Sequence, residues 1–342
     1  IKEFEDRAGR DLLVALYEAT QGKSFQEIVY HEYQSIPDEK AKSLYLTVCL
    51  LHSLGSYTRA GLLSRVHNVG FNEFKENFFK PLEFLVFDRR DYYINDYVYE
   101  SRHELIAEFV VESVLFNEQM RYDEYVMLLN NLDIDYDSDK NVFLYLTNAK
   151  KLLKFFRDPS KIREIYKIAK SQSIKDAKLL QQEAIFEMES SGGSIDKAER
   201  LLIEADELTN HKDNLIRHSL SELLFAKATT ATTLIEKTKL LNDVDVICKG
   251  LIQKRNTSAH PFHTSIKAKL YLLSVYIENS EDYAVEKLIK ETESLIATAI
   301  QQFPDEPHLI ESESNFNEII NNHPKAISLL EKAYEINKNS PY

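Results

Sequence analysis

The sequence predicts a mainly α-helical protein in which a small domain with one β-hairpin precedes an array of paired helices. Glycine and proline are scarce, with 8 of each among 342 residues, against an average usage of about 7% and 5%. This composition leaves little material for the tight turns of an extensive sheet. In most segments the apolar residues recur three or four positions apart, which is the spacing of one helix face.

We expect three domains, over residues 1–36, 37–117 and 118–342. Residues 1–36 carry two apolar stripes at helical spacing, one around Leu12 and one around Phe25, with Gly22 between them. Glycine at such a position favours the end of a helix. We interpret this segment as a helical lid or linker.

Residues 37–117 begin with three predicted helices. Pro37 and Asp38 favour a helix start, and the apolar pattern runs from there to Gly55, a favoured residue just beyond a helix end. Two shorter helices are predicted over 60–67 and about 72–79. The second of these stops at Pro81, because the residue before a proline avoids helical geometry.

A β-hairpin is predicted next. Residues 84–87 and 92–94 are rich in aromatic and branched side chains and flank the charged run 88–91, which favours two strands joined by a turn at 88–91. Three helices followed by a two-stranded wing form a winged-helix arrangement. Winged helices often read DNA through their third helix, but here Lys75 and Lys80 are balanced by Glu73 and Glu76.

The net charge of the whole chain supports the same conclusion about nucleic acids. It is −13 at pH 7, whereas binding to a nucleic-acid backbone depends on clustered Lys and Arg. We therefore expect no nucleic acid as a partner. The most apolar run, residues 44–54, is far too short to cross a bilayer, so we expect no membrane association.

The most informative stretch is 99–111. Leu105, Ile106 and Phe109 recur at helical spacing, and Ser101 is the predicted N-cap of this helix. His103 then falls in the first turn, where unpaired backbone N–H groups and the helix dipole favour an anion. A lone histidine at such a position can also simply cap or pack, and that alternative stays open.

The order of these elements, together with residues 102–104, resembles the winged-helix domain and following helical repeats of STAND NTPases. We compare it with the bacterial antiphage-sensor (Avs-like) type of that family. In the family a Met-His-Asp motif opens this helix, and its histidine contacts the β-phosphate of bound ADP. Arg102 and Glu104 replace Met and Asp here. The resemblance implies that His103 and Arg102 sense a nucleotide phosphate held by an ATPase core outside this sequence.

An acidic run at 133–141 has the spacing of a calcium-binding loop. Asp133, Asp135 and Asp137 alternate as the first ligands of such a loop do. The loop also needs Gly at its sixth position and Glu at its twelfth, where Ser138 and Leu144 stand. We therefore predict no metal and interpret the run as the acidic start of a helix beginning near Lys140.

From residue 118 the predicted helices repeat in pairs. Tetratricopeptide (TPR) repeats carry a small–x3–bulky–x2–small pattern on the second helix of each pair. That pattern occurs most clearly at Ala198/Leu202/Ala205 and Ala326/Leu330/Ala333. First helices are predicted over 142–156, 177–188, 215–228 and 262–277. The sequence therefore predicts a TPR-like α-solenoid, whose stacked pairs form a surface for a protein or peptide ligand.

No catalytic site is predicted in this sequence. It has no phosphate loop followed by Lys-Ser or Lys-Thr, no Cys and His set with zinc spacing, and no nucleophile triad. His260 and His263 are interpreted as part of a turn before a helix. Two cysteines without a spacing pattern, Cys49 and Cys248, fit a reducing cytoplasm.

We therefore expect a non-catalytic, cytoplasmic sensor region of a STAND-type ATPase. Its repeats would recognise a protein, with a phage protein as one candidate, and would couple that event to the nucleotide state of the core. ADP or ATP and a homo-oligomeric active state are implied for the full-length protein. The chain begins at Ile1 without methionine, and we interpret it as a piece of a longer protein. The alternative is a free-standing TPR-like peptide-binding regulator or scaffold protein.

Overall fold

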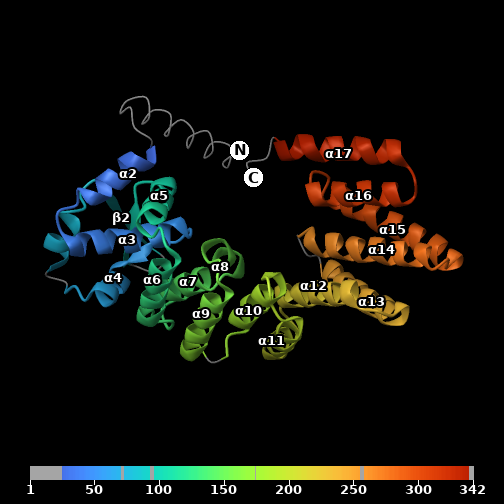
Figure 1. The fold of residues 1–342 in the computed structure, drawn as a ribbon, viewed down its shortest axis with the longest axis horizontal. Coiled ribbons are helices and arrows are strands. Elements are labelled where there is room, and N and C mark those ends of the chain that lie inside the picture. The colour runs from blue at the N-terminus through green and yellow to red at the C-terminus, as the bar shows by residue number, and fades with distance from the viewer. Residues whose placement is uncertain (1–24, 71–72, 93–95, 174, 255–257, 339–342) are drawn as a thin grey trace. The chain divides into compact units, whose positions relative to one another are not determined.

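The computed structural model describes residues 25–70, 73–92, 96–173, 175–254 and 258–338 (Figure 1). It confirms the mainly α-helical fold class, with one small sheet. The chain forms two compact units, which divide between Gly193 and Ser194; we call them the N-terminal and C-terminal units. The predicted boundaries after residues 36 and 117 both fall inside the N-terminal unit and stay predictions. The predicted helix around Leu12 lies outside the described residues.

The N-terminal unit begins with helices that surround a three-stranded sheet. Its elements are α2 (Phe25–Gln34), α3 (Glu39–Ser53), β1 (Thr58–Arg59), α4 (Ala60–His67), the π-helix η2 (Lys75–Phe79), β2 (Val86–Asp91), β3 (Asp96–Ser101) and α5 (Glu104–Val114). Local signals set the limits of α3. The Asp38 side chain caps it by accepting a hydrogen bond from the Ala41 N–H at 2.8 Å, and Gly55 follows it with a φ of +80°, a conformation that favours glycine.

The strands differ from the prediction in where the hairpin turns. They are antiparallel in the order β1-β3-β2, and the charged run 88–91, predicted as the turn, belongs to β2. Charged residues are tolerated there because β2 is an edge strand. Arg89 pairs with Glu100 on β3 at 3.7 Å, and its guanidinium lies 4.5 Å from the centre of the Tyr57 ring.

Helix α3 is the centre of this core. Leu44, Val48 and Leu51 are fully buried, because α3 contacts α4, α5, η2 and the sheet and therefore has no wide polar face. Helix α2 also packs on α5, where the rings of Phe25 and Phe109 meet edge to face at 5.3 Å. The part of the predicted lid that the structure describes is thus joined to this core.

Further helices complete the N-terminal unit: α6 (Glu118–Asn131), α7 (Asp137–Leu146), α8 (Ala149–Phe155), α9 (Pro159–Gln172) and α10 (Ala177–Glu189). The single helix predicted over 142–156 is wrong, since α7 and α8 are separate. The Asn148 side chain caps α8 by accepting from the Lys151 N–H at 3.1 Å. The Thr147 carbonyl accepts from the Tyr166 hydroxyl at 3.0 Å, which satisfies a carbonyl at the break.

The C-terminal unit consists of stacked antiparallel helices: α11 (Ile195–Leu208), α12 (Asn214–Thr230), α13 (Leu234–Gln253), α14 (His260–Glu278), α15 (Asp282–Gln302), α16 (Pro307–Ile319) and α17 (His323–Lys338). Helices α12 and α13, α14 and α15, and α16 and α17 form pairs (Figure 1), and the first helices α12, α14 and α16 also contact one another in succession. This is the predicted TPR-like arrangement.

The small residues of the repeat pattern are buried, as the spacing requires. Ala198, Ala205 and Ala333 are at most 2% exposed. The bulky position Leu330 is different, because it is 51% exposed. In the described part of the chain no helix follows α17 to cover that side of it. In these two matches the pattern therefore marks packing positions correctly except at Leu330.

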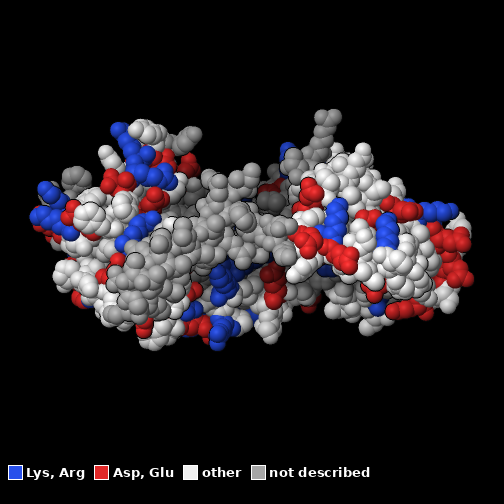
Figure 2. Space-filling model, turned by 90° about the horizontal axis from the view of Figure 1, so that it is seen from above, with Lys and Arg blue, Asp and Glu red and all other residues white. Residues whose placement is uncertain are grey.

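The surface carries both signs of charge. Figure 2 shows Lys and Arg side chains interspersed with Asp and Glu on the face that it draws. Among the described residues, we find no helix that is both long enough and apolar enough to cross a membrane.

Candidate functional site

His103 itself, rather than the predicted Ser101, is the N-cap of α5. Its backbone is extended, with φ −161° and ψ 143°, and its Nδ1 accepts a hydrogen bond from the Leu105 N–H at 3.1 Å. The side chain is exposed. The prediction of Ser101 as the cap was wrong because β3 continues through Ser101, so the helix starts later than the local pattern suggested.

The cap bond determines which nitrogen of neutral His103 carries the proton. Nδ1 accepts from a backbone N–H, so its lone pair is occupied and the proton resides on Nε2. An imidazole in this state donates a hydrogen bond from Nε2 without having to become charged. This donor lies at a helix start, where the helix dipole also favours negative charge. The arrangement can bind an anion.

Ser101 and His52 hold the backbone of His103 in place. The Ser101 hydroxyl donates to the His103 carbonyl at 2.9 Å. Because the only proton of the Ser101 hydroxyl is used in that bond, Ser101 Oγ must accept from His52. His52 Nδ1 therefore donates to the Ser101 Oγ at 2.8 Å. Burial lowers the pKa of His52, which keeps that ring neutral at pH 7. No sequence signal pointed to His52, which lies in α3, 49 positions from Ser101.

Arg102 has a different partner from the one the resemblance implies. Its guanidinium forms an ion pair with Glu32 on α2, and the two side chains are 22% and 31% exposed. This pair ties α2 to the beginning of α5. The structure therefore groups His103 with Ser101 and His52, and Arg102 with Glu32. Contact of either residue with a phosphate stays a prediction.

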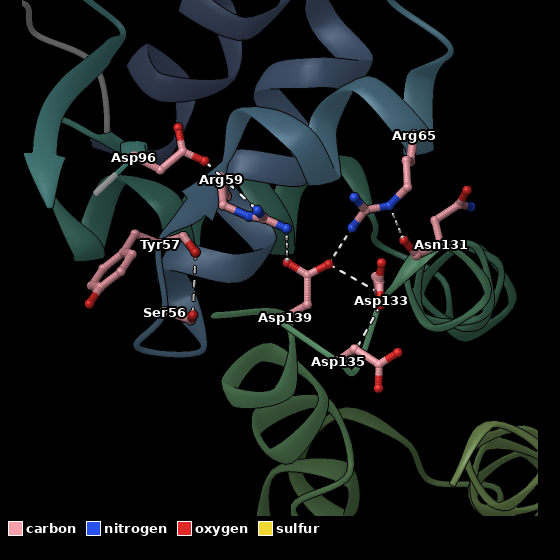
Figure 3. A network of polar contacts seen from close by, with 9 residues as sticks. All are labelled: Ser56, Tyr57, Arg59, Arg65, Asp96, Asn131, Asp133, Asp135 and Asp139. Atoms are coloured by element: carbon pink, nitrogen blue, oxygen red, sulfur yellow. Dashed lines mark hydrogen bonds and ion pairs between the residues drawn. The ribbon is translucent and has the colours of Figure 1, made fainter. Parts of the chain in front are cut away.

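A second polar cluster centres on Asp139 in α7 (Figure 3). The Asp139 side chain is 1% exposed, and its carboxylate forms ion pairs with Arg59 at 3.3 Å and with Arg65. It also accepts from the Asp133 N–H at 3.1 Å. Figure 3 shows both guanidinium groups pointing toward this carboxylate. The acidic run is thus partly internal, and its helix begins at Asp137 rather than near Lys140.

The two arginines extend this cluster across several elements. Arg65 donates from Nε to the Asn131 carbonyl at 2.8 Å. Arg59 lies 3.9 Å from Asp96 of β3 and stacks over the Tyr136 ring at 4.3 Å. The cluster therefore joins β1, β3 and α4 to the helices α6 and α7. We call the elements from α2 to α5 the sheet domain, and α6 and α7 follow it in the chain. No sequence signal pointed to this joint.

Comparisons with known proteins add little. No protein-family model matches the chain, and no curated protein matches it. Solved structures are similar to the chain, and among them is the Signal Transduction ATPase with Numerous Domains (STAND) protein with a tetratricopeptide repeat sensor from Pyrococcus horikoshii. It shares 17% identity over 93% of this chain, with a TM-score of 0.39, and this chain spans 47% of its length. Values this low carry no inference about activity, ligand or partner.

Proposed function

We propose that this chain is the non-catalytic regulatory and ligand-sensing region of a STAND-type ATPase. The order of elements in the N-terminal unit supports the proposal. Helix α3, strand β1, helices α4 and η2, and the hairpin β2–β3 follow one another as in a winged helix, and α5 opens directly after the hairpin. Stacked helix pairs follow, and such pairs offer an extended surface to a protein ligand.

One observation carries the proposal, namely the state of His103. In the STAND family the histidine at this helix start contacts the β-phosphate of ADP. Here the exposed His103 ring has Nδ1 occupied by the Leu105 N–H, which leaves Nε2 as the donor of the neutral ring. A neutral donor of this kind suits a site that must hold ADP in the resting state and release it on activation.

The Asp139 cluster connects the elements proposed to sense the ligand with those proposed to contact the nucleotide. It ties the strand and helix that carry Arg59 and Arg65 to the first helices after the sheet domain. Because a buried ion pair tolerates little change in geometry, a shift of the repeats would be transmitted to the sheet domain. We propose that ligand binding to the repeats reaches the nucleotide through this joint.

The proposed partner is a protein, and recognition of a phage protein by an antiviral sensor is the most specific form of the proposal. Both cysteines, Cys49 and Cys248, are free and buried, which fits a reducing cytoplasm. The ATPase core, a homo-oligomeric active state and any effector would belong to the full-length protein.

The test uses the full-length protein encoded by the gene. A phosphate loop should be encoded before Ile1, and the purified protein should retain ADP. His103→Ala removes one hydrogen bond to a charged group, worth about 1–2 kcal/mol, so ADP should dissociate roughly 5- to 30-fold faster. Basal effector activity should rise, because the resting state alone is weakened.

His31→Ala is the matched control, since His31 is an exposed histidine on α2. It should leave ADP release unchanged. If the gene encodes no phosphate loop, or if His103→Ala releases ADP at the wild-type rate, the proposal is wrong.

A further inference from the structure

Four of the ten histidines of the chain come together in the C-terminal unit. The ring centres of His218 on α12 and His260 on α14 are 5.9 Å apart. Those of His263 on α14 and His308 on α16 are 5.6 Å apart. The stacking of the first helices brings these residues together from positions up to 90 residues apart. We call these four residues the histidine cluster.

The cluster is open to solvent on one side. His260 is exposed, and the His308 side chain is 63% exposed. His218 is more buried, with 17% of its side chain exposed, and its Nε2 lies 3.0 Å from the Thr264 hydroxyl. The cluster is therefore a partly buried site whose rim a partner can reach.

A cation and aromatic rings extend the same face along α14. His260, His263 and Lys267 are three and four residues apart, so they share one face of that helix. Lys267 is exposed, and its Nζ lies 4.5 Å from the centre of the Phe225 ring. The Tyr271 ring meets Phe225 edge to face at 5.9 Å. A positive group and two aromatic side chains thus follow the four imidazoles.

Carboxylates on the neighbouring helices lie at the rim of the cluster. Glu222 on α12 is 3.7 Å from His218 Nδ1, and Glu311 on α16 is 3.6 Å from His308 Nδ1. Both separations exceed hydrogen-bond length but lie within ion-pair distance, so these carboxylates are placed to pair with His218 and His308 when those rings are protonated.

Charged groups on α13 and α15, the other helices packed against α14, have partners outside the histidine cluster. Lys237 on α13 lies 6.0 Å from the Tyr271 ring, beyond Lys267. Glu291 on α15 pairs with Lys269 at 3.2 Å. Lys269 is buried, whereas Lys267 on the exposed face of α14 is not. The charges that face the cluster are therefore Lys267 and the two rim glutamates.

We propose that the histidine cluster and Lys267 bind the carboxylates of an acidic segment of a protein partner, and that binding tightens as the pH falls. This inference rests on the ligand-sensing role proposed for the repeats and names the chemistry of the partner. Imidazole N–H groups and a lysine ammonium are donors that suit carboxylates. His260 and His308 also lie in the first turns of α14 and α16, where the dipole favours negative charge.

Other ligands fit the site less well. Within the described residues, no group of three or more His, Cys, Asp or Glu side chains is arranged to hold a metal ion. A nucleic-acid backbone carries a phosphate at every nucleotide, so a continuous row of charges would have to pass the carboxylates of Glu222 and Glu311 at the rim. An acidic protein segment differs because its carboxylates can be spaced apart. It can place one carboxylate at His263 and Lys267 and apolar side chains against Phe225 and Tyr271.

The direction of the pH effect follows from His263. Burial, and then the nearby His308 and Lys267, lower the pKa of His263 to about 4. A bound carboxylate would return that pKa toward its ordinary value of about 6.5. The complex then takes up a proton that the free protein does not hold. Linkage requires binding to strengthen by roughly tenfold between pH 7.5 and pH 5.5 for one such histidine.

The experiment measures fluorescence anisotropy with a labelled peptide of the sequence EEFEELEE, using the whole chain at pH 7.5, 6.5 and 5.5. A second peptide has glutamine in place of every glutamate. The glutamate peptide should bind at least tenfold more tightly at pH 5.5 than at pH 7.5. The glutamine peptide should bind weakly at each pH.

Variants assign the effect to the cluster. His263→Gln and Lys267→Gln should each weaken binding at pH 5.5 by about tenfold, and His308→Gln, at an exposed position, provides a variant that keeps the core intact. His323→Gln is the matched control, because His323 is an exposed histidine at the start of α17. It should bind the glutamate peptide as the wild type does.

Several outcomes would overturn the inference. They are no binding of the glutamate peptide at any pH, equal binding of both peptides, or a pH dependence that survives in His263→Gln and His308→Gln. Loss of binding on addition of EDTA would indicate a metal site instead. Each of these results would leave the nucleotide experiment on His103 unaffected, because that experiment tests the other unit.

Discussion

Replacing Asp139 by alanine removes the carboxylate that two buried guanidinium contacts depend on. Arg59 and Arg65 would keep their positive charges, and the Asp133 N–H would lose its acceptor. The expected effect is large, because the variant removes the closest carboxylate of the mostly buried Arg59 and leaves it only Asp96 at 3.9 Å. The loss should be confined to the N-terminal unit, which holds all of these residues.

The magnitude follows from how deeply each partner is buried. Removing one member of a buried ion pair costs about 3–5 kcal/mol. The Asp139 and Arg59 side chains are 1% and 14% exposed, but Arg65 is 35% exposed. Water screens the charge of Arg65 and reduces its share. We therefore expect a loss near the lower end of the range, about 3 kcal/mol, and a fall in Tm of roughly 6–12 °C for a unit of this size.

The assay is urea and thermal unfolding of the whole chain followed by circular dichroism, with Asp135→Ala as the matched control. Asp135 is an exposed carboxylate in the same acidic run, so its loss should change the unfolding free energy by less than about 0.5 kcal/mol. A double-mutant cycle with Arg59→Ala should give a coupling of at least about 1 kcal/mol. If Asp139→Ala unfolds like Asp135→Ala, the Asp139 cluster does not hold the joint together.

Three further predictions concern packing, pH and metal. Ala198→Leu and Ala205→Leu should each cost about 1–3 kcal/mol, because both alanines are fully buried and extra volume would separate the helices; unchanged melting would contradict the repeat register. Burial lowers the pKa of His67 to about 4, so this histidine takes up a proton in the unfolded chain at a higher pH than in the folded one. The free energy of unfolding should therefore fall as the pH drops from about 6.5 to 4. In urea titrations at pH 7 and pH 4.5, that fall should be about 2–3 kcal/mol smaller for His67→Gln than for the wild type. Millimolar calcium should leave the Tm unchanged, and a rise of several degrees would revive a metal site at residues 133–141.

Signals within one or two turns of the chain were enough to predict several of the helices, although not the break between α7 and α8. Helix α3 starts next to Asp38, which is its cap rather than part of its first turn, and Gly55 follows its end as expected. The prediction for 60–67 matches α4, and those for 177–188, 215–228 and 262–277 match α10, α12 and α14 to within about two residues at each end. These features could be read from the sequence because capping and helical periodicity depend on residues only a few positions apart.

The hairpin and the start of α5 were placed less well. The charged run 88–91 reads as a turn, yet it forms the edge strand β2, because pairing with β3 supplies partners for its backbone and for Arg89. The local pattern predicts Ser101 as a helix cap, yet Ser101 is the last residue of β3 and His103 is the cap. Strand pairing decides both cases, and the identity of a paired strand is not contained in the local pattern.

The sequence by itself determined the helical class, the succession of paired helices and the position of His103 at a helix start. Only the tertiary structure placed Arg102 on Glu32, joined Asp139 to an arginine 80 positions away, and gathered four histidines from three helices. Local free energies choose helix or strand over a few residues. Buried charges and clustered imidazoles depend on which distant surfaces meet, and that is decided by the packing of the core.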